Sequence, residues 1–166
     1  AELYFYGDIV SSTWSKWEKE DKCPQDVADF LNEIKNTNEL SIYINSGGGS
    51  VFAGISIYNM LKRHSAYKTV YVDGLAASIA SVIALAGDKV IIPATAQYMI
   101  HSPWTIAIGN ATDFRKVADD LDKIETSIIN VYKENLRDDV NIDEIIDMVH
   151  KETWLNGEEA SKYFNI

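Results

Sequence analysis

A serine, a histidine and a glycine-rich turn are the parts of this chain whose chemistry goes beyond packing. Ser78 follows a short apolar strand and a run of small residues, at the expected start of a helix. His101 ends a second apolar strand, and Gly47-Gly48-Gly49 ends a third. A serine hydroxyl is a weak nucleophile until a neighbouring base, usually a histidine, takes its proton. Together the three segments predict acyl transfer to serine, with main-chain N–H groups stabilising the oxyanion.

Each of these features also has a plainer interpretation. Ser78 could cap the helix that follows it, and His101 could be a hydrogen-bonded histidine of the core. The glycines could form a structural turn or cradle a phosphate. The phosphate interpretation is weak: Gly49 and Gly54 have the spacing of a P-loop, but Ile55-Ser56 stands where that motif requires Lys-Ser/Thr. The local pattern alone leaves these alternatives open.

The segments that must position these residues alternate between strand and helix. Short runs rich in β-branched and aromatic residues are separated by stretches with apolar residues at helical spacing. Gly74 is expected to make a tight turn ahead of Ser78. The alternation is typical of an α/β fold. The expected strands are 3–9, 40–45, 70–72, 89–93 and 97–101. Two helices are expected to begin at Pro24 and at Val51, and four more are expected over 78–86, 112–132, 142–149 and 156–163.

Composition narrows the class of protein. The 166 residues are 46% hydrophobic, which predicts a single folded domain over 1–166. A net charge of −10 argues against a nucleic-acid partner. With Cys23 as the single cysteine there is no internal disulfide, so a cytoplasmic location is expected. No apolar run reaches the ~18 residues of a membrane span. No metal or cofactor is expected, because no ligand cluster with the spacing of a metal site is present.

Five stretches resemble the proteolytic subunit of the Clp protease family, and most closely its branch in phages and prophages, which is grouped with head-maturation proteases. The resemblance implies a crotonase-like spiral of ββα units with a protruding long handle helix. It also implies a serine endopeptidase that assembles into a homo-oligomeric ring and cuts unfolded or tethered polypeptide. Because this chain has no P-loop, any dependence on ATP needs a separate unfoldase partner. The matching stretches are 45–49, 53–58, 74–78, 99–101 and 152–155 with 158–160.

The resemblance also implies roles for individual residues. Ser78 corresponds to the nucleophile and His101 to the general base, while the amides of Gly49 and Ile79 correspond to the oxyanion hole. Gly47 stands where the family usually has proline. The family's substrate lies along the glycine-rich segment as an added strand, which implies substrate-binding roles for Gly47, Gly48 and Ser50.

The acid that should orient the imidazole is a second position where the family pattern is not met. Aligned without gaps on Trp154, the family's aspartate falls on Met148, and the alternative position used in phage relatives falls on His150. The nearest acids are Asp147 and Glu152. A one-residue shift within the expected helix would bring Asp147 onto the imidazole. We therefore predict Asp147 as the orienting carboxylate.

Two other functions remain open from the sequence. A crotonase-type acyl-CoA enzyme would use a similar amide-lined hole, but such enzymes rely on paired glutamates, and no basic cluster here suggests a CoA site. A non-catalytic assembly homologue would keep the long helix and lose turnover. The absence of an acid at Met148 and His150 keeps that second alternative open.

Overall fold

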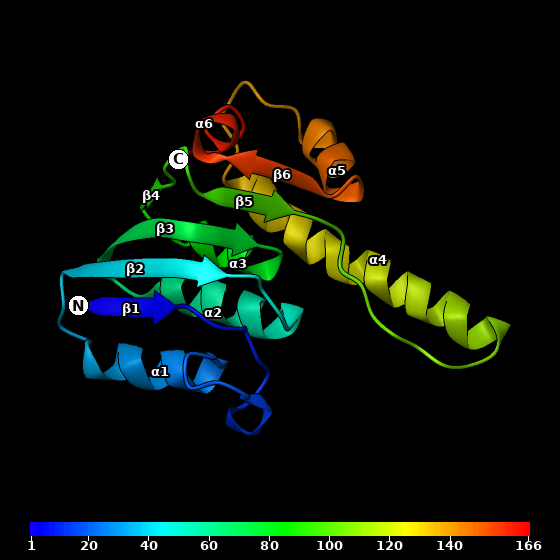
Figure 1. The fold of residues 1–166 in the computed structure, drawn as a ribbon, viewed down its shortest axis with the longest axis horizontal. Helices are drawn as coiled ribbons and strands as arrows, with labels where there is room; N and C mark the ends of the chain where they lie inside the picture. Colours follow the sequence, from blue (N-terminus) through cyan, green and yellow to red (C-terminus); the bar gives the residue numbers. More distant parts are fainter.

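A six-stranded sheet organises the computed structural model, which describes residues 1–166 (Figure 1). The strand order is β1-β2-β3-β5-β6, and β4 pairs with the first part of β3. All pairs are parallel except β5 with β6, which is antiparallel. The strands are β1 Glu2–Phe5, β2 Glu39–Ser46, β3 Tyr67–Ala77, β4 Lys89–Ile91, β5 Gln97–Ile100 and β6 Thr153–Asn156.

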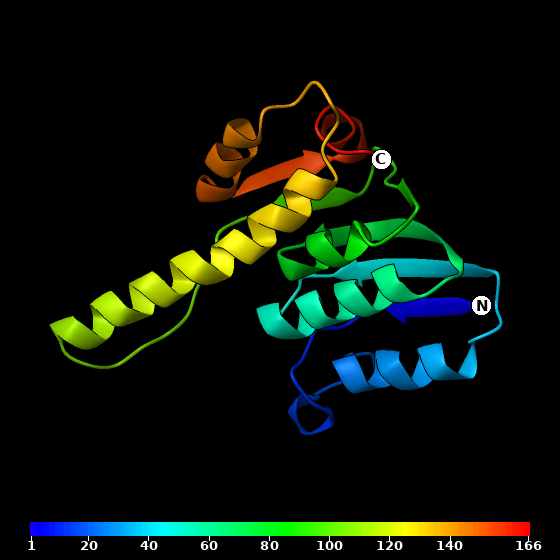
Figure 2. The same ribbon diagram turned by 180° about the vertical axis from the view of Figure 1, so that it is seen from behind.

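Helices cover one face of this sheet. Figure 2 shows α2 and α3 in front of the strands, α1 below β1 beside α2, and α4 crossing nearby and extending well past the sheet. The expected α/β fold and the protruding long helix are confirmed. None of the helices combines the length and apolarity needed to cross a bilayer. The helices are α1 Pro24–Glu33, α2 Val51–Arg63, α3 Ile79–Ala84, α4 Ala111–Glu134, α5 Ile142–His150 and α6 Gly157–Ala160, with a 3₁₀ turn at Thr13–Ser15.

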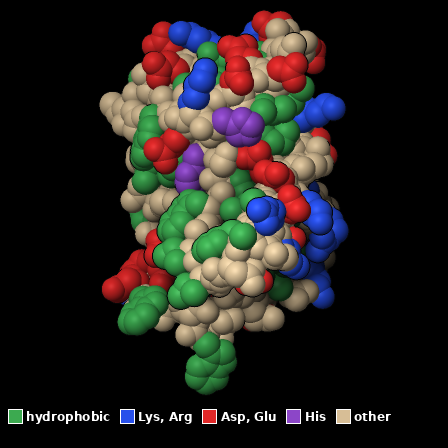
Figure 3. All heavy atoms as spheres, turned by 90° about the vertical axis from the view of Figure 1, so that its right-hand side faces the viewer, with side chains coloured by type: hydrophobic (Ala, Val, Ile, Leu, Met, Phe, Trp, Pro, Cys, Tyr) green, Lys and Arg blue, Asp and Glu red, His purple; other side chains and the backbone are tan.

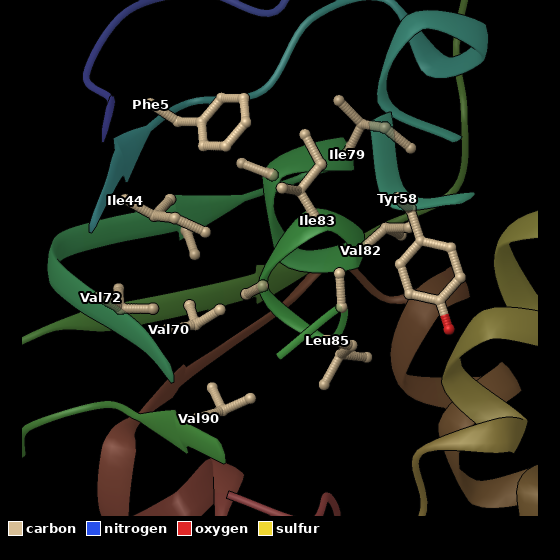
Figure 4. Close-up of a cluster of buried hydrophobic side chains, with 14 of the residues drawn as sticks. Phe5, Ile44, Tyr58, Val70, Val72, Ile79, Val82, Ile83, Leu85 and Val90 are labelled. Atoms are coloured by element: carbon tan, nitrogen blue, oxygen red, sulfur yellow. The ribbon is translucent and has the colours of Figure 1, made fainter. Parts of the chain in front are cut away.

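The core lies between the sheet and α3. Every residue of α3 is buried, as expected for a helix apolar on all sides. Figure 4 shows Ile79 and Ile83 of this helix among side chains from the strands, including Val70 of β3. A Cβ on Gly54 of α2 would overlap the side chain of Ile79, so the glycine lets α2 and α3 pack closely. Each large side chain buried here contributes roughly 1.5–3 kcal/mol of transfer free energy. This packing fixes where α3 begins, and therefore where Ser78 lies.

The tight turn expected at Gly74 is wrong, because Gly74 lies inside β3. The pairing of β3 with β2 shifts here: Ile44 pairs with Val72, but Ser46 pairs with Ala76. The strand thus bulges, which is a common use of glycine within a sheet. A Cβ on Gly74 would lie 2.8 Å from Asn45 Oδ1, so the position is also crowded. The bulge carries the end of β3 to the start of α3 without reversing the chain.

Two other expected elements differ at their ends. The first strand ends at Phe5 rather than residue 9, although Ile9 still forms an isolated parallel bridge with Gly49. The expected helix over 156–163 is shortened to α6, and strand β6 precedes it. The sequence did not predict β6, because its four residues are too short to show a period of their own. Both differences bear on the site described next.

Candidate active site

Ser78 lies at the junction of β3 and α3, in a backbone conformation (φ 57°, ψ −130°) rare for a residue with a side chain. Its hydroxyl does not cap α3, so the capping interpretation is wrong. Instead Ser78 Oγ lies 2.7 Å from Nε2 of His101. The Ser78 N–H donates to the Met99 carbonyl oxygen at 3.0 Å, which ties the junction to β5. The structure therefore brings the hydroxyl and the imidazole within hydrogen-bond distance.

The pairing of β3 with β5 explains this meeting. Ala77 is in register with Met99, and both strands run in the same direction. Ser78 is the first residue after β3 and His101 the first residue after β5, so both leave the sheet at the same end. The imidazole side chain is only 16% exposed. Two strand ends, each recognisable in the sequence, thus converge on one point.

The carboxylate beside the imidazole belongs to Glu152, whose Oε1 lies 3.4 Å from His101 Nδ1. The antiparallel register explains the position: Ile100 pairs with Thr153, so the next residues outward, His101 and Glu152, face each other. The structure does not bring the predicted Asp147 to the imidazole: that residue is exposed on α5 and makes no hydrogen bond or ion pair with His101. The reason is that the strand register, and not a helix face, sets which acid reaches the ring.

The other two positions considered for the acid point elsewhere. The Met148 side chain is half-buried and packs against the core. His150 Nε2 lies 3.0 Å from Glu125 Oε2, which joins the end of α5 to α4. Neither residue contributes to the group around Ser78.

Ser78 and Glu152 are the only residues other than glycine with a positive φ, 57° and 50°. Such conformations cost on the order of 1–3 kcal/mol each and gather at functional sites. At Glu152 the strain is held by neighbouring bonds: its N–H donates to the Val149 carbonyl at 3.2 Å, and Thr153 Oγ1 donates to the Met148 carbonyl at 2.7 Å. The two strained residues of the chain thus flank one imidazole.

The glycine turn packs against the same serine. Gly48 and Gly49 have φ values of 97° and 145°. A Cβ on Gly48 would lie 2.8 Å from Ser78 Cβ. The Gly49 N–H donates no hydrogen bond in the structure, and the Ile79 N–H, at the first position of α3, has no partner within the helix. The chain therefore has main-chain donors without partners close to the serine.

Alanine substitutions at Gly47 and Gly49 should have opposite effects on stability, because a side chain has room at Gly47 and none at Gly49. A Cβ on Gly47 meets nothing within 4 Å, so Gly47→Ala is expected to stabilise the fold by about 0.4–1 kcal/mol through a less flexible unfolded chain. A Cβ on Gly49 would overlap the backbone oxygen of Ile9, and the positive φ adds strain, so Gly49→Ala should destabilise by at least about 2 kcal/mol. Urea unfolding of both variants measures the difference. Equal stabilities would contradict the described turn.

The Ser78 and His101 side chains open into a cleft of about 410 Å³ at the end of the sheet toward which the parallel strands point. Figure 3 views this end and shows histidine side chains reaching the surface between apolar and acidic groups. Of the three residues predicted to contact substrate, Gly47 and Gly48 line the cleft, whereas Ser50 lies outside the lining and caps α2. No cluster of three or more His, Cys, Asp or Glu side chains could hold a metal ion. The remaining lining residues are Asp8, Gly49, Val51, Met99, Pro103 and Trp104.

Comparison with known proteins gives one consistent result. A family model described as Clp protease matches residues 14–164. The chain is similar to the ATP-dependent Clp protease proteolytic subunit of Leuconostoc citreum, 34% identical over 139 residues, and to that of Bacteroides fragilis, 31% identical over 136. A third such relative, from Deinococcus radiodurans, is 29% identical over 137 residues. These matches cover 81% of this chain and 68%, 65% and 66% of the relatives. Together with the fold and the Ser78–His101 pair, they establish that the chain belongs to the Clp protease family.

Proposed function

We propose that this chain is a serine endopeptidase that hydrolyses peptide bonds through an acyl-enzyme on Ser78. The observation that carries the proposal is the 2.7 Å contact between Ser78 Oγ and His101 Nε2, with Glu152 on the other ring nitrogen. In this arrangement the ring has an acceptor facing the hydroxyl when Nδ1 carries the proton. Glu152 Oε1, 3.4 Å from Nδ1, lies where a carboxylate orients the ring and stabilises the imidazolium that forms. We assign Glu152, and not Asp147, as the orienting acid.

The reaction follows from these positions. His101 Nε2 takes the hydroxyl proton while Ser78 Oγ bonds to the substrate carbonyl carbon, and the carbonyl oxygen becomes an oxyanion. The amides of Gly49 and Ile79 donate to that oxyanion, and one such donor is worth roughly 2.7–4 kcal/mol of barrier. The imidazolium then gives its proton to the amide nitrogen as the C–N bond breaks. Water, deprotonated by the same imidazole, releases the acid product and restores the hydroxyl.

The substrate class and the assembly are part of the same proposal. Unfolded or tethered polypeptide fits an open cleft bordered by a glycine turn, against which an extended chain can pair. A homo-oligomeric ring is supported by the segment before α4, where Trp104, Ile106 and Ile108 alternate along the chain with exposures of 72%, 84% and 98%. An exposed apolar segment with no partner in its own chain is typical of an interface. The phage or prophage branch, and a cytoplasmic location, complete the proposal.

A separate unfoldase is proposed for any step that needs ATP. The curated relatives are named ATP-dependent. This chain has a triple-glycine turn without the Lys-Ser/Thr of a phosphate-binding loop. A partner that hydrolyses ATP and delivers unfolded polypeptide would account for both facts.

A fluorophosphonate probe tests the nucleophile directly. The assembled protein is expected to be labelled once per chain, and peptide mapping by mass spectrometry should place the adduct on Ser78. Labelling of a Ser78→Ala variant at the rate of the parent would overturn the assignment. Absence of labelling together with absence of hydrolysis of any peptide would favour the non-catalytic homologue. Turnover of CoA thioesters would favour the acyl-CoA alternative, although the cleft lining contains no lysine or arginine.

A further inference from the structure

One acid lines the catalytic cleft, and nothing in the structure neutralises it. Asp8 is the only carboxylate among the lining residues, and no lysine or arginine lies beside it there. Its side chain makes no ion pair and no hydrogen bond, although its main-chain atoms do. Asp8 is exposed, so its carboxylate faces the solvent of the cleft rather than the protein interior. With no partner in its own chain, it is available to a cation that enters the cleft.

Asp8 lies next to the nucleophile through the glycine turn. The following residue, Ile9, donates its N–H to the Gly48 carbonyl at 2.8 Å, and its own carbonyl accepts from the Ser50 N–H at 2.7 Å. Gly48 in turn packs against the Cβ of Ser78. The order across the cleft wall is therefore Asp8, the glycine turn, then the nucleophile. A substrate that pairs with the glycine turn must pass the carboxylate close to the bond that is cut.

The backbone of Asp8 is held in place on both sides. Its N–H donates to Oδ1 of Asp21 at 2.9 Å, and its carbonyl accepts from the Lys22 N–H at 3.0 Å. Asp21 is buried, and the N–H groups of Glu18, Trp17 and Asp8 hold the pKa of its carboxyl below the usual value. The carboxylate of Asp8 is thus presented from a fixed main chain. A group positioned in advance loses less entropy when a ligand binds.

We propose that Asp8 determines specificity by binding a lysine or arginine side chain of the polypeptide substrate near the cleaved bond. The proposal rests on the proposed peptidase function, and it names the class of sequence that the cleft selects. A cation near Asp8 gains Coulomb attraction, and an acid at the same place is repelled. Trp104 lies in the same lining and offers an aromatic face that also favours a cation.

The test uses fluorogenic peptides that differ only in having Lys, Gln or Glu at each position flanking the cleaved bond. At one position the parent is expected to favour Lys over Glu by roughly fivefold or more in kcat/KM. Asp8→Asn should abolish most of that ratio, and Asp8→Lys should reverse it. The ratio should also shrink between low and high salt, since screening weakens a solvent-accessible pair. The proposal is overturned if Asp8→Asn leaves the Lys/Glu ratio unchanged at every position.

Asp138→Asn is the matched control, because it removes the same charge from an exposed residue outside the cleft lining. It should leave the Lys/Glu ratio as in the parent. If it instead lowers the ratio as much as Asp8→Asn does, the preference comes from net charge and the proposal fails. Binding of the same peptides to the Ser78→Ala variant, read by fluorescence anisotropy, keeps the test independent of turnover. Loss of all hydrolysis in the parent with a Lys preference intact in binding would overturn the peptidase function and leave the Asp8 subsite standing.

Discussion

Replacing Ser78 by alanine is expected to lower kcat for a short fluorogenic peptide by roughly 10⁵–10⁶-fold. The hydroxyl is the only nucleophile within hydrogen-bond distance of His101 Nε2, so no neighbouring group can replace it. The residual rate should come from the oxyanion donors and from binding alone. Steady-state kinetics on the assembled protein measure the loss, and KM should change little because the substituted atom is small.

Ser56→Ala provides the matched control for this substitution. Ser56 is exposed on α2 and is absent from the cleft lining, so its removal should leave kcat within about twofold of the parent. Circular dichroism and light scattering establish that both variants are folded and assembled. A Ser78→Ala variant that retains more than about one hundredth of the parent kcat would exclude the acyl-enzyme mechanism.

Replacing Glu152 by glutamine is expected to lower kcat by roughly 10³–10⁴-fold. The amide keeps the size of the side chain but favours the wrong tautomer of His101 and does not stabilise the imidazolium. Because Glu152 acts through the imidazole and does not touch substrate, KM should stay near the parent value. Glu152→Asp should recover part of the loss, limited by a side chain one methylene shorter. These values come from steady-state kinetics with one peptide at saturating and limiting concentrations.

Asp147→Asn tests the choice of Glu152 over Asp147 as the orienting acid. Asp147 is exposed and five residues from Glu152 in the sequence, and it makes no hydrogen bond or ion pair with the ring. Its replacement should therefore change kcat by no more than about twofold. A loss with Asp147→Asn that equals or exceeds the loss with Glu152→Gln would restore Asp147 as the orienting acid.

The pair of Ser78 and His101 could be predicted because each ends an apolar strand visible in the sequence. In a parallel sheet the carboxyl ends of neighbouring strands meet at one edge, so two local signals suffice to place both side chains together. Glu152 could not be placed in the same way. Its position depends on the antiparallel register of β6 with β5, a contact between segments more than 50 residues apart. Alignment of the region as one helix therefore led to Asp147.

The position of Asp8 in the cleft likewise could not be predicted from the sequence. The expected strand over 3–9 includes it as one polar residue in an apolar run, a pattern typical of any strand exposed on one face. Only the bridge between Ile9 and Gly49 brings this segment to the cleft. At Gly74 the glycine does indicate an irregular backbone, but glycine is common both in β-bulges and in turns, so the sequence alone does not distinguish the two. Such choices depend on the neighbouring strand and not on the local sequence.

The positive φ angles of Ser78 and Glu152 lower the stability of the fold at the two residues that flank the imidazole. Thermal stability and catalytic activity therefore place opposite demands on these positions. Glycine at either position would relax the main chain by an amount on the order of 1–3 kcal/mol, before the added flexibility of the unfolded chain is subtracted. At Ser78 the substitution removes only a short side chain, and at Glu152 it removes one that is 58% exposed. A laboratory selection for thermal stability alone is therefore expected to favour glycine at these two positions. The selected protein would be more stable but would no longer hydrolyse peptides. Directed evolution of a thermostable variant therefore requires an assay of peptide cleavage in every round of selection.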